Sequence, residues 1–427
     1  MHTKHLSIQK QKKLHNSTIF SIEKQNNINY NETMKKKIDE FIKISDENIL
    51  MIVLAFLSFS TGIWTNYRQL WLENVGFNVQ DISKILSAAL ICSSIISFII
   101  SIYSTRVKVK NVVLLTTIFK SFSMLTLLLN KNTYIIKVCM LICIMCETIF
   151  SIAFYPLLST VNKKESAIKK QALVNYLAKD AGIITCGLLI GVTVGNIVFD
   201  YNSCLFISMI SSILGCLTLI LFDQNKYYNK RNILPLKKAL KNLTKSKVNN
   251  YFLFTQFIMN ISYGMIFGLA MLVLTNYIGF NVSVASVFII VCNLIGSIAC
   301  SLFNNHADYL SVRMSTLIKY GSRVLVYSLA FLVPNMFTFI FAYVVAHISA
   351  RILDDKVNGT YVRRIKTNSQ FLFGNIRYFI LSLGEGVGTY LAGYMLEISF
   401  RSLFLGASIF TVLQIIMFLN LDKIRES

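Results

Sequence analysis

Charged residues are scarce in this chain. They make up 15% of its 427 residues, hydrophobic residues make up 54%, and the mean hydropathy is +0.58. This composition excludes a soluble protein if the apolar residues fall in separate blocks, each long enough to cross about 30 Å of hydrocarbon as a helix. We find twelve such blocks, at 48–72, 82–104, 110–129, 133–158, 172–199, 201–222, 250–277, 283–303, 315–333, 335–353, 371–396 and 400–420.

Residues suited to metal or hydrolytic chemistry are also few. All nine cysteines lie inside apolar blocks, and His347 is the only histidine in one. A zinc site needs several Cys or His ligands that converge, and disulfides need outward-facing cysteines, so neither is predicted. The chain has no His-Glu-x-x-His motif and no paired-aspartate site, which argues against an intramembrane enzyme. We therefore predict no enzymatic activity and no cofactor or metal.

Basic residues outnumber acidic ones by 42 to 20, which gives a formal net charge of +22. In a soluble domain this surplus would suggest nucleic acid. Here 32 of the basic residues fall in alternate loops, and the intervening loops carry only Lys131 and Arg401. By the positive-inside rule, this predicts a multi-pass protein of the cell membrane with both termini in the cytoplasm. Anionic lipids are the expected partners of the basic loops, and no nucleic-acid partner is expected.

Polar segments divide the chain into parts. The first 47 residues are rich in Lys and Asn, and the apolar block after them is too long for a signal-peptide core, so we expect it to remain as the first span. A basic segment with Pro235 separates the sixth and seventh blocks. The predicted parts are a cytoplasmic tail at 1–47, an N-terminal six-helix bundle at 48–222, a cytoplasmic linker at 223–249, a C-terminal six-helix bundle at 250–422 and a cytoplasmic tail at 423–427.

The two bundles contain an internal repeat. The Gly-Phe-Asn-Val segment that begins at Gly76 recurs at Gly279, an offset of 203 that also pairs Lys120 with Arg323. After a slip of five residues, an offset of 198 pairs Lys179 with Arg377. Duplicated membrane-embedded halves are typical of secondary transporters, whose binding sites lie where the halves meet. We therefore predict an all-α membrane protein built from two pseudo-symmetric halves.

This organisation resembles the major facilitator superfamily over about residues 48–422. A signature loop of that family, Gly-x-x-x-Asp-Arg-x-Gly-Arg-Lys, joins the second and third helices and recurs between the eighth and ninth. The second copy is partial here, with Asp308 at the aspartate position, Asn304 at the glycine and Arg313 at the last basic position. The first copy departs further, with Ser101, Thr105 and Lys110 at those places and Arg106 after the missing aspartate.

Polar residues recur at helical spacing along several spans, as Thr61, Thr65 and Arg68 do on the first. The resemblance implies that the first and seventh spans line a central cavity. Such stripes also serve as packing contacts between membrane helices, and this alternative stays open. The predicted substrate-cavity residues are Thr61, Thr65, Arg68, Gln256, Asn260, Tyr263, His347 and Tyr378.

The resemblance also implies charge contacts that close the cytoplasmic side. Lys179 and Arg377 are expected on the cytoplasmic side of their spans, about 9 to 11 Å in, in a gating or structural role. Lys319 is expected to reach water by snorkelling. The predicted cytoplasmic gate residues are Arg106, Lys110, Asp308, Arg313, Lys179 and Arg377.

Carboxylates deep in a span are candidates for proton coupling, because hydrocarbon disfavours their charged form. Glu385 is the first choice, since it lies on a polar stripe and no neighbour in sequence neutralises it. Asp180 is the second and Glu147 the third. An ion pair between Lys120 and Glu147 is the alternative for Glu147, and it would remove this residue from the proton carriers.

Together these features predict a proton-coupled secondary transporter that moves a small molecule across the cytoplasmic membrane as a monomer, by alternating access. Export of an amphipathic or toxic compound is one version, favoured by aromatic residues on the polar spans. Uptake of an organic anion is the second, favoured by an excess of deep cations over acids. A transporter-like sensor or assembly protein that moves no solute is the alternative from another class, favoured by the degenerate first loop.

Overall fold

The computed structural model describes residues 45–103, 108–161, 165–190, 192–194, 197–224, 246–304, 309–359 and 367–426. Arg106, Asp308, the predicted tail as far as residue 44 and the linker from 225 to 245 lie outside these residues. The chain divides into a short unit, Met1–Ile49, and a large one, Leu50–Ser427, which contains nearly all of the helical structure.

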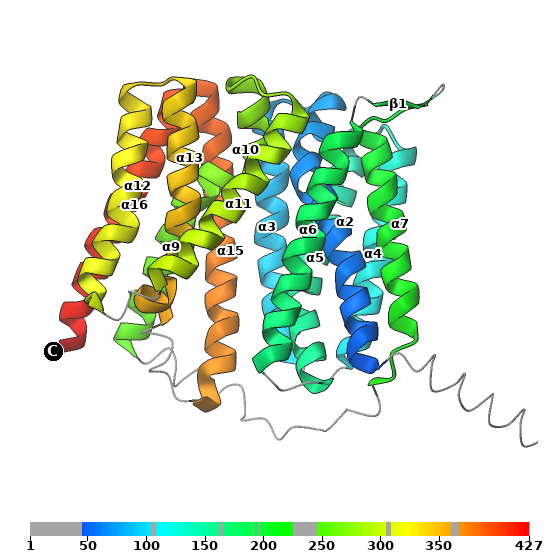
Figure 1. The fold of residues 1–427 in the computed structure, drawn as a ribbon, viewed down its shortest axis with the longest axis horizontal. Helices are drawn as coiled ribbons and strands as arrows, with labels where there is room; N and C mark the ends of the chain where they lie inside the picture. The colour runs from blue at the N-terminus through cyan, green and yellow to red at the C-terminus, as the bar shows by residue number, and fades with distance from the viewer. Residues whose placement is uncertain are drawn as a thin grey trace, which may run out of the picture. The chain divides into compact units, whose positions relative to one another are not determined.

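The first half of the large unit is helical, because a segment in lipid must satisfy its backbone hydrogen bonds internally. One short β-hairpin, with β1 (Thr193–Val194) antiparallel to β2 (Ile197–Val198), joins its last two helices. The helices are α2 (Asp46–Asn74), α3 (Val79–Tyr103), α4 (Val109–Leu129), α5 (Thr133–Val161), α6 (Glu165–Leu189) and α7 (Tyr201–Ile220) (Figure 1).

The second half repeats this order with two π-helical segments added. Its elements are α9 (Lys247–Phe267), α10 (Ala270–Leu272), the π-helix η2 (Val273–Tyr277), α11 (Val282–Asn304), α12 (Val312–Leu332), α13 (Met336–Arg351), the π-helix η4 (Asp355–Gly359), α15 (Thr367–Ile398) and α16 (Phe400–Glu426) (Figure 1).

Nine spans in the described part of the chain are long and apolar enough to cross a membrane. The other long helices of this part, α6, α12 and α15, correspond to three further predicted blocks. Each of these three contains charged residues well inside its length, among them Lys179, Arg323 and Glu385. The less apolar helices are therefore those in which the charges of the sequence are concentrated.

The predicted block 172–199 is not one continuous span. Its helix begins earlier, at Glu165, and ends at Leu189, after which the chain forms the hairpin of β1 and β2. Lys179 consequently lies about 21 Å along α6 from its first residue, close to the middle of the helix. The sequence places Lys179 about 11 Å from the start of its predicted block, so the earlier start of α6 puts this residue deeper in the helix than predicted.

The repeated Gly-Phe-Asn-Val segments form equivalent turns, one after α2 and one after η2. Gly76 and Gly279 have positive φ angles of 106° and 82°, a conformation that glycine adopts at little cost. Asn276 Nδ2 donates a hydrogen bond of 2.5 Å to Glu73 Oε1, which joins the two turns. We call this end of the bundle the turn end, and the opposite end, where α7 ends and α9 begins, the linker end.

Glycines reveal how the halves correspond. Gly62 on α2 lies so close to the backbone of Lys179 on α6 that no Cβ would fit, and Gly264 on α9 lies equally close to the backbone of Glu385 on α15. In the same way Gly187 on α6 lies against Ser286 on α11, whereas Gly393 on α15 lies against Ser83 on α3. Lys179 and Gly187 on α6 thus correspond to Glu385 and Gly393 on α15, in both cases with an offset of 206 residues.

The sequence-based pairing of Lys179 with Arg377 is therefore wrong, because Glu385 is the equivalent of Lys179. The error has a local cause. Eleven residues, including the hairpin, separate α6 from α7, whereas only Ser399 separates α15 from α16. An alignment that continues the register of the last helix pair back through this insertion misplaces α6 against α15.

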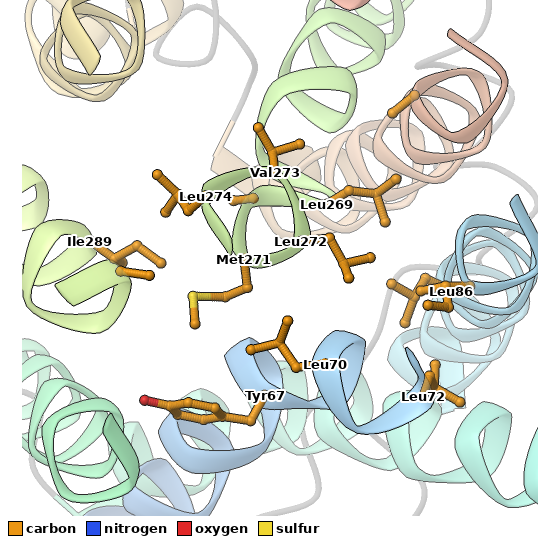
Figure 2. Close-up of a cluster of buried hydrophobic side chains, with 14 of the residues drawn as sticks. Tyr67, Leu70, Leu72, Leu86, Leu269, Met271, Leu272, Val273, Leu274 and Ile289 are labelled. Atoms are coloured by element: carbon orange, nitrogen blue, oxygen red, sulfur yellow. The ribbon is translucent and has the colours of Figure 1, made fainter. Parts of the chain in front are cut away.

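The halves meet at the turn end through a buried apolar cluster. Figure 2 shows Tyr67 and Leu70 of α2 facing Met271 and Leu272 of the second half. All four are at most 4% exposed. Beside the cluster, Gln69 Nε2 donates a hydrogen bond of 2.8 Å to the carbonyl of Gly268. Tyr67 and Ser286 share a hydrogen bond of 2.5 Å, so side chains as well as apolar packing join the halves here.

Candidate functional site

A buried group of three charges lies inside the first half. Lys120 Nζ on α4 lies 3.0 Å from Glu147 Oε1 on α5, and Arg68 Nη1 on α2 lies 3.3 Å from Glu147 Oε2. None of the three residues is more than 9% exposed. The predicted ion pair between Lys120 and Glu147 is confirmed, and Arg68 joins it as a second cation. One carboxylate thus serves two cations, which leaves a surplus positive charge in the group.

Hydroxyl groups complete the surroundings of Lys120. Its Nζ donates to Ser60 Oγ at 3.1 Å and to Thr61 Oγ1 at 3.4 Å. Thr61 also donates to the carbonyl of Leu57. Thr61 therefore belongs to this buried group, and Thr65, one turn further along α2, has a buried hydroxyl without a hydrogen-bond partner among the described residues.

Glu385 lies thirteen residues, about 20 Å, from the turn end of α15. Its side chain has no hydrogen bond or ion pair among the described residues. Two cations of the first half, Arg68 and Lys179, act on its charge. Lys179 likewise has no hydrogen bond or ion pair within the described part of the chain, and it is within electrostatic range of both Glu147 and Glu385. Opposite charges thus occupy equivalent positions on α6 and α15.

Aromatic rings gather on α9 and α13. The ring of Phe267 lies 4.7 Å from that of His347, 5.2 Å from Tyr343 and 4.5 Å from Tyr263, measured between centroids. His347 Nε2 is buried and has no hydrogen-bond partner among the described residues. Tyr263 is also within electrostatic range of Glu385. The predicted cavity residues Tyr263 and His347 therefore belong to one aromatic cluster, which reaches Glu385 through Tyr263.

A second polar network lies toward the linker end of the second half. Arg377 Nε donates to Gln256 Oε1 at 3.0 Å, and Gln256 Nε2 donates to Asn358 Oδ1 at 2.9 Å. Asn358 Nδ2 and Lys319 Nζ both donate to Asp354 Oδ1, at 2.7 and 2.6 Å. Gln256 therefore bonds only to residues of its own half in the described part of the chain, where it joins neighbouring helices.

The snorkelling expected of Lys319 is wrong, because the residue is 1% exposed and forms an ion pair with Asp354. The sequence interpretation also missed Asp354 and Asn358. Both follow the predicted tenth span, which ended at residue 353, and their spacing of four residues was the available signal.

The remaining predicted residues are Asn260, Tyr378 and Asp180. Asn260 Nδ2 donates to the carbonyl of Leu381 and so joins α9 to α15. Tyr378 is 39% exposed and lies within electrostatic range of Glu385. Asp180 lies in the fields of its neighbour Lys179 and of Arg351 from the second half, and the side chain of Asn293 also acts on it.

Two predicted gate residues lie at the linker end of the helices. Lys110 Nζ donates to the carbonyls of Ile220 and Phe222, and its backbone N–H donates to Gln224 Oε1. It therefore neutralises the C-terminal end of α7, within one half. Arg313 is exposed in the first turn of α12. None of the described gate residues, Lys110, Lys179, Arg313 and Arg377, forms an ion pair between the halves.

A family model described as Major Facilitator Superfamily matches residues 49–352. Among solved structures, a single-residue variant of the nucleoside transporter NupG has a TM-score of 0.72 at 11% identity, with 88% of this chain and 100% of that chain covered. A transporter of the POT family in complex with 5-aminolevulinic acid has a TM-score of 0.66 at 12% identity and covers 87% and 94%.

A bacterial homologue of the human lysosomal transporter Spinster, in an inward-facing and unoccupied conformation, has a TM-score of 0.63 at 11% identity, with coverage of 88% and 94%. No curated protein matches the chain significantly. At these identities the solved structures establish the fold, which agrees with the predicted all-α arrangement of two pseudo-symmetric bundles.

Proposed function

Because the chain belongs to the major facilitator superfamily, we propose that it is a secondary active transporter that couples movement of a small molecule to protons. Its two halves would rock about the seam between them and expose the site to one side of the membrane at a time. Tyr67, Gln69 and Asn276 hold the halves together at the turn end. Opening that end requires these contacts to separate.

The observation that carries proton coupling is the isolation of Glu385. A coupling carboxylate must gain and lose a proton within each cycle, which a tightly paired carboxylate resists. Glu147 has two cations within 3.3 Å, and the surroundings of Asp180 include two cations, Lys179 and Arg351, and the side chain of Asn293. Glu385 has no such partner among the described residues, although the charges of Arg68 and Lys179 reach it across the seam. We therefore assign the coupling proton to Glu385.

Between the two directions of transport, the described contacts favour uptake of an anion. Three of the five aromatic residues that favoured export of an amphipathic compound, Trp64, Tyr67 and Trp71, are at most 2% exposed and pack in the apolar cluster, whereas Tyr263 and Tyr378 are more exposed. The three buried residues therefore offer little surface to a solute in this conformation. The excess of deep cations persists after pairing, since Glu147 is shared by two of them and Lys179 has no close acid partner among the described residues.

The test is solute flux in proteoliposomes with an imposed pH gradient, for the parent chain and for Glu385→Gln. Suitable probes are a nucleoside and 5-aminolevulinic acid, which relatives bind or transport, together with a hydrophobic cation for the export version. We expect Glu385→Gln to abolish flux driven by the gradient and to retain exchange between equal concentrations on both sides. Glu397→Gln, at the turn end of the same helix, is the matched control.

Gradient-driven flux through Glu385→Gln at the parental rate would overturn the assignment of the proton. Absence of flux for every probe, in a protein that is folded, would favour the sensor or assembly alternative.

A further inference from the structure

We propose that the transported solute is an organic monoanion with a flat ring, and that it binds together with one proton held by Glu385. This inference rests on the proposed function and specifies its substrate. Two observations support this inference. The first is the balance of charge at the seam, and the second is the aromatic cluster of Tyr263, Phe267, Tyr343 and His347.

The buried charges at the seam do not cancel. Arg68, Lys120, Lys179 and Arg351 contribute four positive charges, whereas Glu147, Asp180 and Glu385 contribute three negative ones. Lys120 is directed to Glu147 and to hydroxyls, which leaves Arg68 and Lys179 as the cations nearest to Glu385. Arg68 Nε is buried and has no hydrogen-bond partner among the described residues. A carboxylate from the solute would accept a hydrogen bond from this group.

Charged and titratable groups reach Glu385 from several helices. Arg68 comes from α2, Lys179 from α6, Tyr263 from α9 and Tyr378 from α15 itself. The charged residues of α3 and α16, which also pack on α15, lie in the terminal two turns of those helices. Besides its burial, the charges that act on Glu385 are those of Arg68 and Lys179.

This arrangement makes a proton and an anion bind together. In the empty protein the ionised Glu385 balances part of the charge of Arg68 and Lys179. An entering anion competes with Glu385 for the same two cations, and at low dielectric this repulsion is large. Protonation of Glu385 removes the competitor. By linkage, the proton then tightens binding of the anion and the anion tightens binding of the proton, by the same factor.

The charge of the site is also the same when it is empty and when it holds both ligands. Each added proton is matched by one added negative charge, so the site changes sides of the membrane with no change in buried charge. Binding of the proton alone would add to the surplus positive charge, which a low-dielectric medium disfavours, and binding of the anion alone is opposed by the ionised Glu385. Transport should consequently be electroneutral for a monoanion.

We place the ring of the solute against the aromatic cluster, in which Tyr263, Phe267 and His347 are partly exposed and Tyr343 is buried. Phe267, Tyr343 and His347 lie within 5.2 Å of one another, centroid to centroid, in tilted and edge-to-face arrangements. Such geometries accept a further ring at comparable separation. The unpartnered Nε2 of His347 can donate or accept a hydrogen bond at the edge of that ring. Tyr263 connects this cluster to Glu385.

The chain offers its own reporter for a binding test. It contains two tryptophans, Trp64 and Trp71, which precede and follow Arg68 on α2 with their rings 5.9 Å apart. Their fluorescence can be followed in nanodiscs during titration with benzoate, phenylacetate and 3-phenylpropionate. The matched neutral probes are the corresponding amides.

We expect at least one of the three carboxylates to bind, about tenfold more tightly at pH 6 than at pH 7, because one proton is taken up per anion. Its amide should bind at least tenfold more weakly, with no dependence on pH. Equal binding of acid and amide, absence of a pH effect, or no binding of any of the three carboxylates would overturn the proposal.

Variants separate this proposal from the proposed function. Glu385→Gln, which imitates the protonated residue, should bind the carboxylate tightly at both pH values. Lys179→Gln should weaken binding at least tenfold, whereas Lys179→Arg should retain it. Arg401→Gln removes an exposed cation at the turn end and should change nothing. Proton-driven flux that depends on Glu385 but does not distinguish acid from amide would sink the substrate assignment and leave the proposed function intact.

Discussion

The two halves of the molecule copy one another in backbone packing and differ in the charges they bury. Gly62 and Gly264 bring equivalent helices into backbone contact in each half. Lys120 and Arg323 are equivalent cations, yet Lys120 has the carboxylate of Glu147, whereas Arg323 Nε donates 2.5 Å to the hydroxyl of Ser349. The repeat thus maintains the close approach of helices, while the buried charges are distributed differently.

The difference indicates where function lies. Close backbone contact tolerates only glycine, so both copies must retain it for the halves to fold alike. Buried charges are costly, so an arrangement confined to one half is expected to serve binding or coupling more than folding. Lys179 in one half and Glu385 in the other are the clearest example, because a symmetric pair of cations would leave more unbalanced charge at the seam.

The largest expected effect comes from removing the acid that only the first half has. Glu147→Gln leaves Lys120 and Arg68 buried without a counter-charge, which should lower the free energy of unfolding by about 3–5 kcal/mol. The equivalent change in the second half, Ser349→Ala, removes one hydrogen bond to Arg323 and should cost about 1.5–3 kcal/mol. Unfolding in detergent, followed by circular dichroism, measures both. Equal losses would contradict the asymmetry.

A second prediction examines what the halves share. Gly62→Ala and Gly264→Ala each place a methyl group against the backbone of the facing helix, of Lys179 and Glu385 respectively. Each should therefore cost about 1–3 kcal/mol, and the two losses should be similar because the contacts are equivalent. Gly321→Ala is the control, since nothing lies within 4 Å of a Cβ added there. A loss confined to one half would show that the backbone contacts are not equivalent.

Much of this arrangement can be predicted from sequence because it depends on local patterns. Apolar blocks predict the helices, the repeat of Gly76 at Gly279 predicts the two halves, and helical depth predicts the ion pair of Lys120 with Glu147. Depth in its span and the lack of neutralising neighbours single out Glu385 as the proposed coupling residue, and the structure gives it no close partner among the described residues.

What sequence cannot supply depends on register and on side-chain direction. The hairpin after α6 shifts the alignment of the two halves, so the sequence pairs Lys179 with Arg377 in place of Glu385. The polar stripe of Gln256 and Asn260 has the spacing of a cavity lining, but both side chains bond within the second half. Periodicity identifies a shared face of a helix, and the partner of that face is set by tertiary packing.

The smallest expected effect compares two helix caps at the turn end, one in each half. Asp200 Oδ1 accepts 2.9 Å from the backbone N–H of Ser203 at the start of α7, and Asn335 Oδ1 accepts 2.9 Å from that of Thr338 at the start of α13. Asp200→Ala and Asn335→Ala should each cost about 1 kcal/mol at pH 7. Thermal unfolding of the two variants measures this loss.

The two caps should respond differently to acid. Burial alone would raise the pKa of Asp200, but hydrogen bonds from Ser203 and Asn202 lower it below the usual value of a carboxyl group. A carboxyl whose pKa is lower in the folded state contributes stability above its unfolded pKa of about 3.9 and loses it as the pH falls through the folded value. The cost of Asp200→Ala should therefore shrink as the pH falls from about 5 to about 3, while that of Asn335→Ala stays constant. Parallel curves for the two variants would show that the charge of Asp200 adds nothing to its cap.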